Sequence, residues 1–383
     1  MKELRSIVNT YKTIDFSKNK AAIATVVKVQ GSSYRRAGAR MIMTDDGRWT
    51  GAISGGCLEG DALRKARKAI LNGAPSLVTY DTMEDKDAMS LGVGLGCNGI
   101  IDVLIEPVDQ NVPNQINFLE EALNKEEPAV LATVYQAPEK WNHLMGQRWW
   151  LNNHGISGFE SLEESLRDKL VSDMKMALKK YSSFNVKYKV STDDHIDVFI
   201  EFLPPRFHMI LFGGGYDAIP VAKLAKEIGW KITVTDDCVV HIAPSRFPAA
   251  DQVLFSNRDE VVQNLSINDF TAAVLISHNY KYDLAILKSL LKTEIQYIGI
   301  LGPYKRFVKM QGELEKEGNK LEERDLKRIF SPIGLDIGAE TPDEIAFSII
   351  SEIQAFFNKR PGSMLKFKEG PIHKRENGKE VIL

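Results

Sequence analysis

The residues of this chain best suited to chemistry are two cysteines, each placed in a glycine-rich stretch. Cys57 follows Gly55 and Gly56 in SGGCLEG, and Cys97 lies in LGVGLGCNG. Apolar residues at helical spacing predict a helix over about 57–72, which puts Cys57 at or near a helix N-terminus. The dipole and free N–H groups there favour the thiolate, the nucleophilic and metal-binding form of cysteine. Either cysteine alone could be a small residue in a tight turn, but two such loops predict a thiol site.

A short polar and cationic stretch, QGSSYRRAGARM, precedes the first of these loops. Arginine side chains make paired hydrogen bonds to phosphate or carboxylate. The alternative is a solvated hairpin turn whose arginines only lie along the surface. We predict that cofactor-binding residues in this half of the chain are Gly31, Ser32, Arg35, Arg40, Gly55 and Gly56.

The second half of the chain begins with a strand-to-helix turn of the kind that binds dinucleotides. The apolar run FHMILF is followed by GGGYDA, a helical stretch and a second run, KITVTDD. Gly213, Gly215 and Ala218 match the G-x-G-x-x-G/A pattern, and the acid expected to bind a ribose hydroxyl is Asp236. The turn predicts nucleotide or phosphate binding, with NAD(P) as one candidate; the alternative is a turn without a ligand.

Two later loops fall where such a sheet binds ligands, at the carboxyl ends of its strands. His278 follows the apolar run AAVLI, and Asp336 and Glu340 lie in SPIGLDIGAE ahead of another helix. The sequence TPDE at 341–344 predicts an N-cap with a capping box, which is a structural feature. A lone histidine is as often a structural hydrogen-bonding residue as a catalyst, so both interpretations of His278 stay open.

Composition restricts the class of protein. The chain has 383 residues, with 49 Lys and Arg against 51 Asp and Glu, so no overall charge draws it to nucleic acid or to a membrane. The first residues lack the apolar run of a signal peptide, and no run is long enough for a membrane span. Three cysteines without CxxC spacing argue against a disulfide framework and a zinc ribbon. We expect a cytoplasmic protein with reduced thiols.

The pattern of elements predicts two domains and a tail. Residues 1–205 mix strand-like runs with helices near 57–72 and 161–181, which predicts a mixed α+β domain. The pair Pro204-Pro205 then interrupts regular structure. Strands and helices alternate over 206–360, which predicts a Rossmann-like, doubly wound α/β domain, and 361–383 form a C-terminal tail.

Six motifs occur in order between about residues 20 and 358: GSSYRRAGARM, GAISGGCLEG, GLGCNG, VLISHN, YIGILG and PIGLDIGAETPDEIA. Together they resemble the XdhC/CoxI family, accessory proteins of xanthine dehydrogenase and related molybdenum hydroxylases. The resemblance implies a protein that binds molybdenum cofactor, as molybdopterin or a dinucleotide variant. Such a protein helps the cofactor acquire a sulfido ligand from a cysteine desulfurase and delivers it to an apo-hydroxylase. The resemblance also implies that Cys57, Cys97 and His278 are the functional side chains, with both cysteines as contacts to molybdenum or its sulfur.

Three positions depart from the family pattern. Tyr34, Tyr216 and Pro303 stand where the family often has proline, histidine and serine. Tyr216 removes a candidate ligand from the Rossmann turn. Two other functions stay open: an NAD(P)-dependent oxidoreductase that uses this turn, and a redox sensor in which Cys57 and Cys97 form a reversible disulfide. An oxidoreductase would not account for the cysteine loops, so we favour an accessory protein over a catalyst. We also expect a homodimer.

Overall fold

The computed structural model describes residues 1–81, 99–158 and 164–369, which divide into two compact units. The N-terminal unit comprises Met1–Pro205 and the C-terminal unit Arg206–Glu369. Residues 361–369 belong to the C-terminal unit, where Gly362 lies against the side chain of Leu335.

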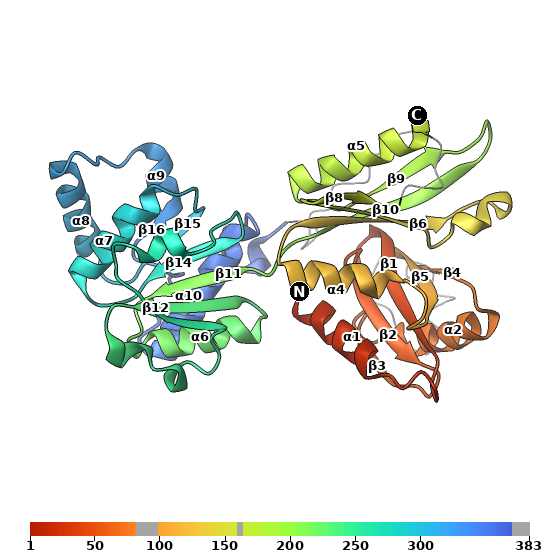
Figure 1. Ribbon diagram of the computed structural model, residues 1–383, viewed down its shortest axis with the longest axis horizontal. Helices are drawn as coiled ribbons and strands as arrows, with labels where there is room; N and C mark the ends of the chain where they lie inside the picture. Colours follow the sequence, from red (N-terminus) through yellow and green to blue (C-terminus); the bar gives the residue numbers. More distant parts are fainter. Residues whose placement is uncertain (82–98, 159–163, 370–383) are drawn as a thin grey trace. The chain divides into compact units, whose positions relative to one another are not determined.

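The N-terminal unit is built on two antiparallel sheets of five strands each (Figure 1). The first has the order β3-β2-β1-β5-β4 and the second the order β8-β7-β6-β10-β9. The strands are β1 (Ala21–Gly31), β2 (Arg40–Thr44), β3 (Trp49–Gly51), β4 (Ser76–Asp81), β5 (Gly99–Val108), β6 (Ala129–Gln136), β7 (Arg148–Asn152), β8 (Gly155–Ser157), β9 (Phe184–Lys189) and β10 (His195–Leu203).

Helices cover the outer face of each sheet, and the inner faces share a core. α2 (Glu59–Asn72) packs on the first sheet through small residues such as Ala62 and Ala66, and α5 (Glu164–Lys180) packs on the second. α1 (Lys2–Thr13) and α4 (Gln115–Lys125) contribute to the core between the sheets, and the 3₁₀ helix η1 spans Glu139–Leu144. Since β1 is covered on both faces, it is buried without interruption from Ala21 to Val27.

The C-terminal unit is a doubly wound α/β domain, which confirms the predicted fold class. Its six parallel strands have the order β13-β12-β11-β14-β15-β16, the strand order of a Rossmann sheet. They are β11 (His208–Phe212), β12 (Lys231–Asp236), β13 (Gln252–Phe255), β14 (Thr271–Leu275), β15 (Tyr297–Ile300) and β16 (Ile329–Phe330).

Alternating side chains of these strands face two helical layers. α6 (Ala218–Glu227) and α10 (Pro342–Phe357) share one core cluster, and α7 (Tyr280–Leu291) and α8 (Tyr304–Lys316) share the other. The remaining elements are α9 (Glu323–Arg328), η2 (Val239–Ile242), η3 (Pro244–Arg246), η4 (Val261–Asn264) and η5 (Leu365–Phe367). The capping box predicted at the start of α10 is confirmed, with Thr341 and Glu344 as its partners.

Candidate functional site

The Cys57 loop, residues 52–58, is folded around the buried side chain of Glu59. This carboxylate accepts hydrogen bonds from the N–H groups of Ile53 (3.1 Å), Ser54 (2.8 Å) and Leu58 (3.2 Å) and from the Ser54 hydroxyl (2.6 Å). Burial alone would raise the pKa of Glu59, but the hydrogen bonds from Ser54 and the backbone lower it below its ordinary value. A buried anion therefore fixes the backbone of the loop.

Cys57 is half-buried and lies two residues before α2, which begins at Glu59. Its Sγ is 3.5 Å from Ser54 Oγ, which also accepts hydrogen bonds from the N–H groups of Gly56 and Leu58, both at 3.1 Å. Gly56 has a φ of 115°, which favours glycine, and no atom lies within 4 Å of the position of an added Cβ. The loop beside the thiol is therefore open on the Gly56 side, where a ligand can approach.

The cationic segment that follows β1 lies against the Cys57 loop. The ring of Tyr34 covers Gly55, where an added Cβ would lie 3.3 Å from a ring carbon. Arg35 forms an ion pair with Glu3 of α1, and the other carboxylate oxygen of Glu3 accepts a hydrogen bond from the N–H of Ala52 at 3.2 Å. The structure thus brings the predicted residues of both segments together. Sequence reasoning missed Glu3, which joins them.

The start of β5 reaches the same end of the sheet. Gly31 at the end of β1 pairs with Gly99 at the start of β5. An added Cβ on Gly99 would lie 2.2 Å from the carbonyl oxygen of Ser32, so only glycine fits there. Ser32 itself is exposed. Cys97 lies outside the described residues, and its predicted role in this site stays a prediction.

Arg40 is not placed to bind a cofactor phosphate, contrary to the prediction. Its side chain is 2% exposed and forms a two-pronged ion pair with Glu201 of β10. Nε donates to Gln115 Oε1 at 3.0 Å, and Nη1 donates to the carbonyl of Gly38 at 2.9 Å. A guanidinium engaged in this way has no face left for a ligand. The sequence could not distinguish it from a surface arginine, because its partner is distant along the chain.

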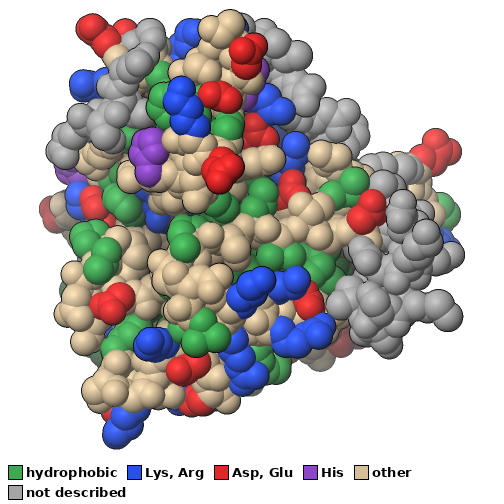
Figure 2. Space-filling view, turned by 90° about the vertical axis from the view of Figure 1, so that its right-hand side faces the viewer, with side chains coloured by type: hydrophobic (Ala, Val, Ile, Leu, Met, Phe, Trp, Pro, Cys, Tyr) green, Lys and Arg blue, Asp and Glu red, His purple; other side chains and the backbone are tan. Residues whose placement is uncertain are grey.

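Basic side chains also cover the exposed side of α2. The residues concerned are Arg64, Lys65, Arg67 and Lys68, all exposed. Figure 2 shows Lys and Arg side chains gathered on a face of the N-terminal unit. Because α2 begins directly after the Cys57 loop, its positive charge would attract an anionic ligand or an acidic partner surface to this end of the unit.

The glycine turn of the C-terminal unit is closed from the inside by Asp236. The buried carboxylate accepts hydrogen bonds from the N–H groups of Gly214 (2.8 Å) and Cys238 (2.9 Å), and the ring Nδ1 of His241 is 3.1 Å away. An added Cβ on Gly214 would lie 2.5 Å from the carbonyl oxygen of His241, which is packed over the turn. Asp236 is therefore not available to a ribose hydroxyl, contrary to the prediction.

The other residues of the predicted dinucleotide motif are explained by packing. Gly213 has a φ of 122°, and an added Cβ would lie 2.4 Å from the Cα of Ser277. Glycine is needed there because β11 and β14 end in contact with each other. Ala218 is the first residue of α6 and is fully buried. Gly215 is the exception, because an added Cβ would lie 3.7 Å from the ring of His278, an ordinary contact distance, so packing does not require glycine there.

His278 lies where the strand order of the parallel sheet reverses, between β11 and β14. Its Nε2 is 2.8 Å from Oδ2 of Asp217, and its side chain is 59% exposed. Its φ is 57°, a left-handed conformation that costs a non-glycine residue roughly 1 kcal/mol or more. Tyr216 is exposed as well. His278 and Tyr216 are therefore exposed beside the half-buried Asp217, at the place where such sheets bind ligands; sequence reasoning missed Asp217.

Asp336 and Glu340 lie on the loop that follows β16, and both are exposed. The N–H of Glu340 donates to the Glu344 carboxylate at 2.9 Å, as part of the cap of α10. In the sheet order β16 is two strands from β14, which is roughly 10 Å. The sequence analysis expected these acids on a loop of their own at the carboxyl end of the sheet, and they lie on the loop after β16; their role as cofactor-binding residues stays a prediction.

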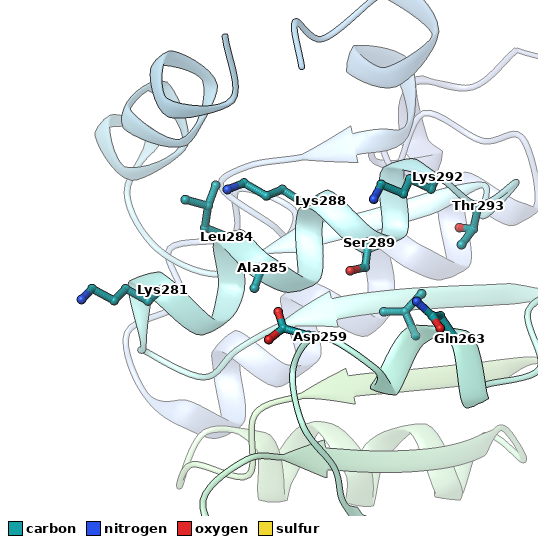
Figure 3. Close-up of a pocket in the computed structure, with 10 residues that line it drawn as sticks. Asp259, Gln263, Lys281, Leu284, Ala285, Lys288, Ser289, Lys292 and Thr293 are labelled. Carbon is teal, nitrogen blue, oxygen red and sulfur yellow. The ribbon is translucent and has the colours of Figure 1, made fainter. Parts of the chain in front are cut away.

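Two hollows of the described structure do not contain the predicted residues. One, of about 630 Å³, lies between α7 and η4, with Lys281, Lys288 and Lys292 along the helix (Figure 3). The other, of about 670 Å³, lies beside α4 and β7 in the N-terminal unit. The described residues also include no group of three or more His, Cys, Asp or Glu side chains arranged to hold a metal ion. Within those residues, no helix is long and apolar enough to cross a membrane.

A two-sheet unit that carries a glycine-cysteine loop, followed by a Rossmann unit, defines the class of protein. The family model described as "XdhC Rossmann domain" matches residues 209–353, and the family model described as "XdhC and CoxI family" matches residues 17–81. The chain is 30% identical over 333 residues to a probable xanthine dehydrogenase subunit of Bacillus subtilis, a match that spans 87% of this chain and 92% of that protein. The chain belongs to the XdhC and CoxI family, which confirms the resemblance seen in its motifs.

Two further relatives resemble the chain over most of its length. The molybdenum cofactor insertion chaperone PaoD of Escherichia coli is 21% identical over 333 residues, spanning 87% of this chain and 82% of that protein. A crystal structure of a xanthine dehydrogenase from Bacillus halodurans matches with a TM-score of 0.74 and 26% identity, covering 94% of this chain and 96% of that one.

Proposed function

We propose that this protein is an accessory protein that binds molybdenum cofactor and supports its sulfuration and insertion into a xanthine dehydrogenase-type hydroxylase. The observation that carries the proposal is the Cys57 loop. A half-buried thiol stands beside an open glycine, with the segment of Tyr34 and Arg35 packed against it. PaoD, a relative along most of the chain, is itself named a molybdenum cofactor insertion chaperone.

The donors of this loop match the parts of the cofactor, which is here a substrate. Molybdenum and its sulfur ligands favour a soft thiolate, the form that Cys57 and Cys97 can supply. A phosphate group favours hydroxyl, guanidinium and backbone N–H donors, the kinds that Ser32, Arg35 and Gly55 can offer. The N–H of Gly56 donates to Ser54 Oγ, so a phosphate would compete with that hydroxyl there. Arg35 is partly satisfied by Glu3, so a phosphate would compete with that carboxylate. Arg40 is not among the proposed phosphate donors, because its N–H groups donate to Gln115, Gly38 and Glu201.

The test compares Cys57→Ser with Cys238→Ser, a matched control because Cys238 is also a half-buried free thiol. Each variant is coexpressed in a host that makes molybdenum cofactor, and the bound pterin is released and identified. Each is then used to reconstitute an apo-hydroxylase. We expect Cys57→Ser to lose cofactor retention and activation while Cys238→Ser keeps both. Equal results with both variants would contradict the proposal, provided that their thermal stabilities match.

The further parts of the proposal concern partners and compartment. We propose a cysteine desulfurase as the sulfur source, an apo-hydroxylase as the recipient, a homodimer as the assembly and the cytoplasm as the compartment. Affinity capture with a purified desulfurase and a purified hydroxylase tests the first two. Light scattering of the purified protein tests the third.

The geometry of the C-terminal unit gives NAD(P) no support at the glycine turn, because Asp236 and the N–H of Gly214 bind each other. We therefore expect the isolated chain to show no turnover of NAD(H) or NADP(H) with purines or aldehydes. Calorimetry with adenine and pterin nucleotides checks the binding separately. Sustained turnover by the purified chain would favour the oxidoreductase alternative. The exposed group around His278 is the place where we propose that this unit meets a ligand.

A further inference from the structure

The two sheets of the N-terminal unit correspond element by element. One helix precedes three strands, a second helix follows, and two strands complete each half. The first half is α1-β1-β2-β3-α2-β4-β5 and the second is α4-β6-β7-β8-α5-β9-β10. Under this correspondence the strand orders of the two sheets are identical.

The agreement extends to the register of the strands. Corresponding residues face each other in the two sheets: Thr25 with Arg40 as Thr133 with Arg148, and Ile23 with Glu106 as Leu131 with Glu201. The ladder also shifts at the same place, where Val27 is passed over in β1 and Tyr135 in β6. β-Bulges are specific features of a fold, so a shared bulge indicates one module used twice.

The sequence carries a faint trace of the same repeat. The strand segment IDVLIE (101–106) corresponds to IDVFIE (196–201), and AAIATV (21–26) corresponds to AVLATV (129–134). These identities fall on strands that occupy the same places in the two sheets. Sequence, topology and register therefore agree on an internal duplication.

Each repeat supplies a carboxylate to the arginine of the other. Arg40 of the first repeat pairs with Glu201 of the second, and Arg148 of the second pairs with Glu106 of the first. Both arginines also donate from Nη1 to the carbonyl of the glycine two residues earlier, at 2.9 Å for Arg40 and 2.8 Å for Arg148. All four side chains are nearly or largely buried. A two-fold dimer interface has the same reciprocal contacts, and here they are formed between two halves of one chain.

Only the first repeat carries the thiol site. After β3 the chain reads AISGGCLEG, whereas the sequence after β8 is GFESLEES, without cysteine or a glycine pair. Between β4 and β5 lie residues 82–98, with Cys97, whereas the segment between β9 and β10 covers only residues 190–194. The second repeat kept the scaffold and its interface but has neither cysteine.

We propose that the second repeat supports the site of the first, and that Glu201 is the residue through which it does so. Glu201 holds Arg40, whose Nη1 donates to Gly38 at the end of the Tyr34 segment. The carbonyl oxygen of Arg40 lies 2.3 Å from the position of an added Cβ on Gly51, directly before the Cys57 loop. Arg40 therefore contacts Gly38, at the end of the Tyr34 segment, and Gly51, directly before the Cys57 loop. Glu201 is therefore a positioning residue.

The inference goes beyond the proposed function, because it concerns the protein without cofactor. The ion pair related by the two-fold arrangement supplies the control: Glu106→Gln breaks an ion pair of the same kind at the same interface. Glu106 also accepts a hydrogen bond from Gln115, which in turn accepts from Arg40, and a glutamine at 106 keeps an acceptor for it. Glu106 is close to the far end of β5, roughly 20 Å along the strand from Gly99. Its partner Arg148 belongs to the second repeat, which has no thiol site.

The experiment measures alkylation of Cys57 by peptide-resolved mass spectrometry, with Cys238 in the other unit as internal reference, together with thermal unfolding. We expect both Glu201→Gln and Glu106→Gln to lower the unfolding temperature. Only Glu201→Gln should change the Cys57 rate relative to Cys238, raising it about fivefold as the loop opens more often. An unchanged rate in Glu201→Gln, or the same change in Glu106→Gln, would overturn the assignment of Glu201.

A second pair of variants removes both charges, so that no unpaired arginine is left buried. These are Arg40→Met with Glu201→Gln, and Arg148→Met with Glu106→Gln, in which the glutamine at 106 still accepts from Gln115. If the single variants do not fold, the same difference in Cys57 rate is expected between these two. A failure of cofactor binding would leave this result untouched, so the two proposals fail separately.

Discussion

The two glycine turns of this chain, before α2 and before α6, look alike in sequence but use their acids differently. At the first, Glu59 follows the turn and binds the N–H groups of Ile53, Ser54 and Leu58 from inside. At the second, Asp236 comes from the next strand and binds the N–H of Gly214 itself. The first arrangement leaves Gly56 open beside the thiol, whereas the second covers the middle glycine.

The comparison teaches that a glycine-rich turn is only a candidate ligand site until the partners of its N–H groups are known. A free N–H can donate to a phosphate, whereas one bound to a buried carboxylate cannot without a large loss. In the G-x-G pattern, close packing against Ser277 requires glycine at Gly213, whereas Gly215 has room for a Cβ. The SGGC turn, in contrast, is open on the Gly56 side.

The largest effect is expected at Asp236. Replacing Asp236 by Ala leaves the buried N–H groups of Gly214 and Cys238 without an acceptor and should lower the free energy of unfolding by about 4 kcal/mol. Chemical denaturation measures it. The control is Asp237→Ala, because that side chain is partly exposed and its partner is Arg258, so the loss should be below about 1 kcal/mol. Tight nucleotide binding that disappears in Asp236→Ala at unchanged stability would restore Asp236 to the ligand site.

The next effect is a pH dependence at the C-terminal turn. Burial raises the pKa of Asp283 to about 6, although Ser277 and Arg306 contact its carboxylate at 2.5 and 2.6 Å. Since the folded pKa is above the unfolded one, its contribution to stability is present below pH 4 and is lost as the pH rises through 6. We expect a decrease of about 3 kcal/mol relative to Asp283→Asn over that interval. Urea unfolding from pH 4 to 7.5 measures it, and parallel curves for the two proteins would contradict it.

The opposite dependence is expected at the Cys57 turn. The lowered pKa of Glu59 means that its contribution is present above its unfolded pKa and is lost as the pH falls through the folded one. Glu59→Gln should remove this acid-side loss and reduce stability at pH 7 by about 1 to 2 kcal/mol. The same urea measurements, extended below pH 4, check this sign as well. A Glu59→Gln protein that loses stability on acidification as steeply as the native chain would show that Glu59 is not the titrating group.

The smallest effect on stability is expected at Cys57 itself. Cys57→Ser is nearly isosteric at a half-buried position, so the free energy of unfolding should change by less than about 1 kcal/mol. In the native protein, Cys57 should be alkylated faster than Cys238, because it stands before the N-terminus of α2. Iodoacetamide labelling at neutral pH compares the two. Faster labelling of Cys238 would place the more reactive thiol at the Rossmann turn.

Much of the fold could be predicted from the sequence. The alternation of apolar runs and helices after Pro205 predicted the doubly wound sheet, and the capping box at Thr341 predicted the start of α10. These features depend on residues close together in the chain, where spacing and turn chemistry carry the information. The duplication was missed, because its identities are confined to short strand segments separated by loops of different length.

The sequence by itself determined which residue types this protein brings to a site: a thiol in a glycine turn, cations after a strand, and a histidine after another strand. Only the tertiary structure decided which of them are free. Arg35 and Cys57 stay accessible in part, whereas Arg40 and Asp236 are taken by Glu201 and Gly214. The physical reason is that burial makes an unpaired charge costly, so a charge that folds inward must find a partner, and that partner can come from anywhere in the chain.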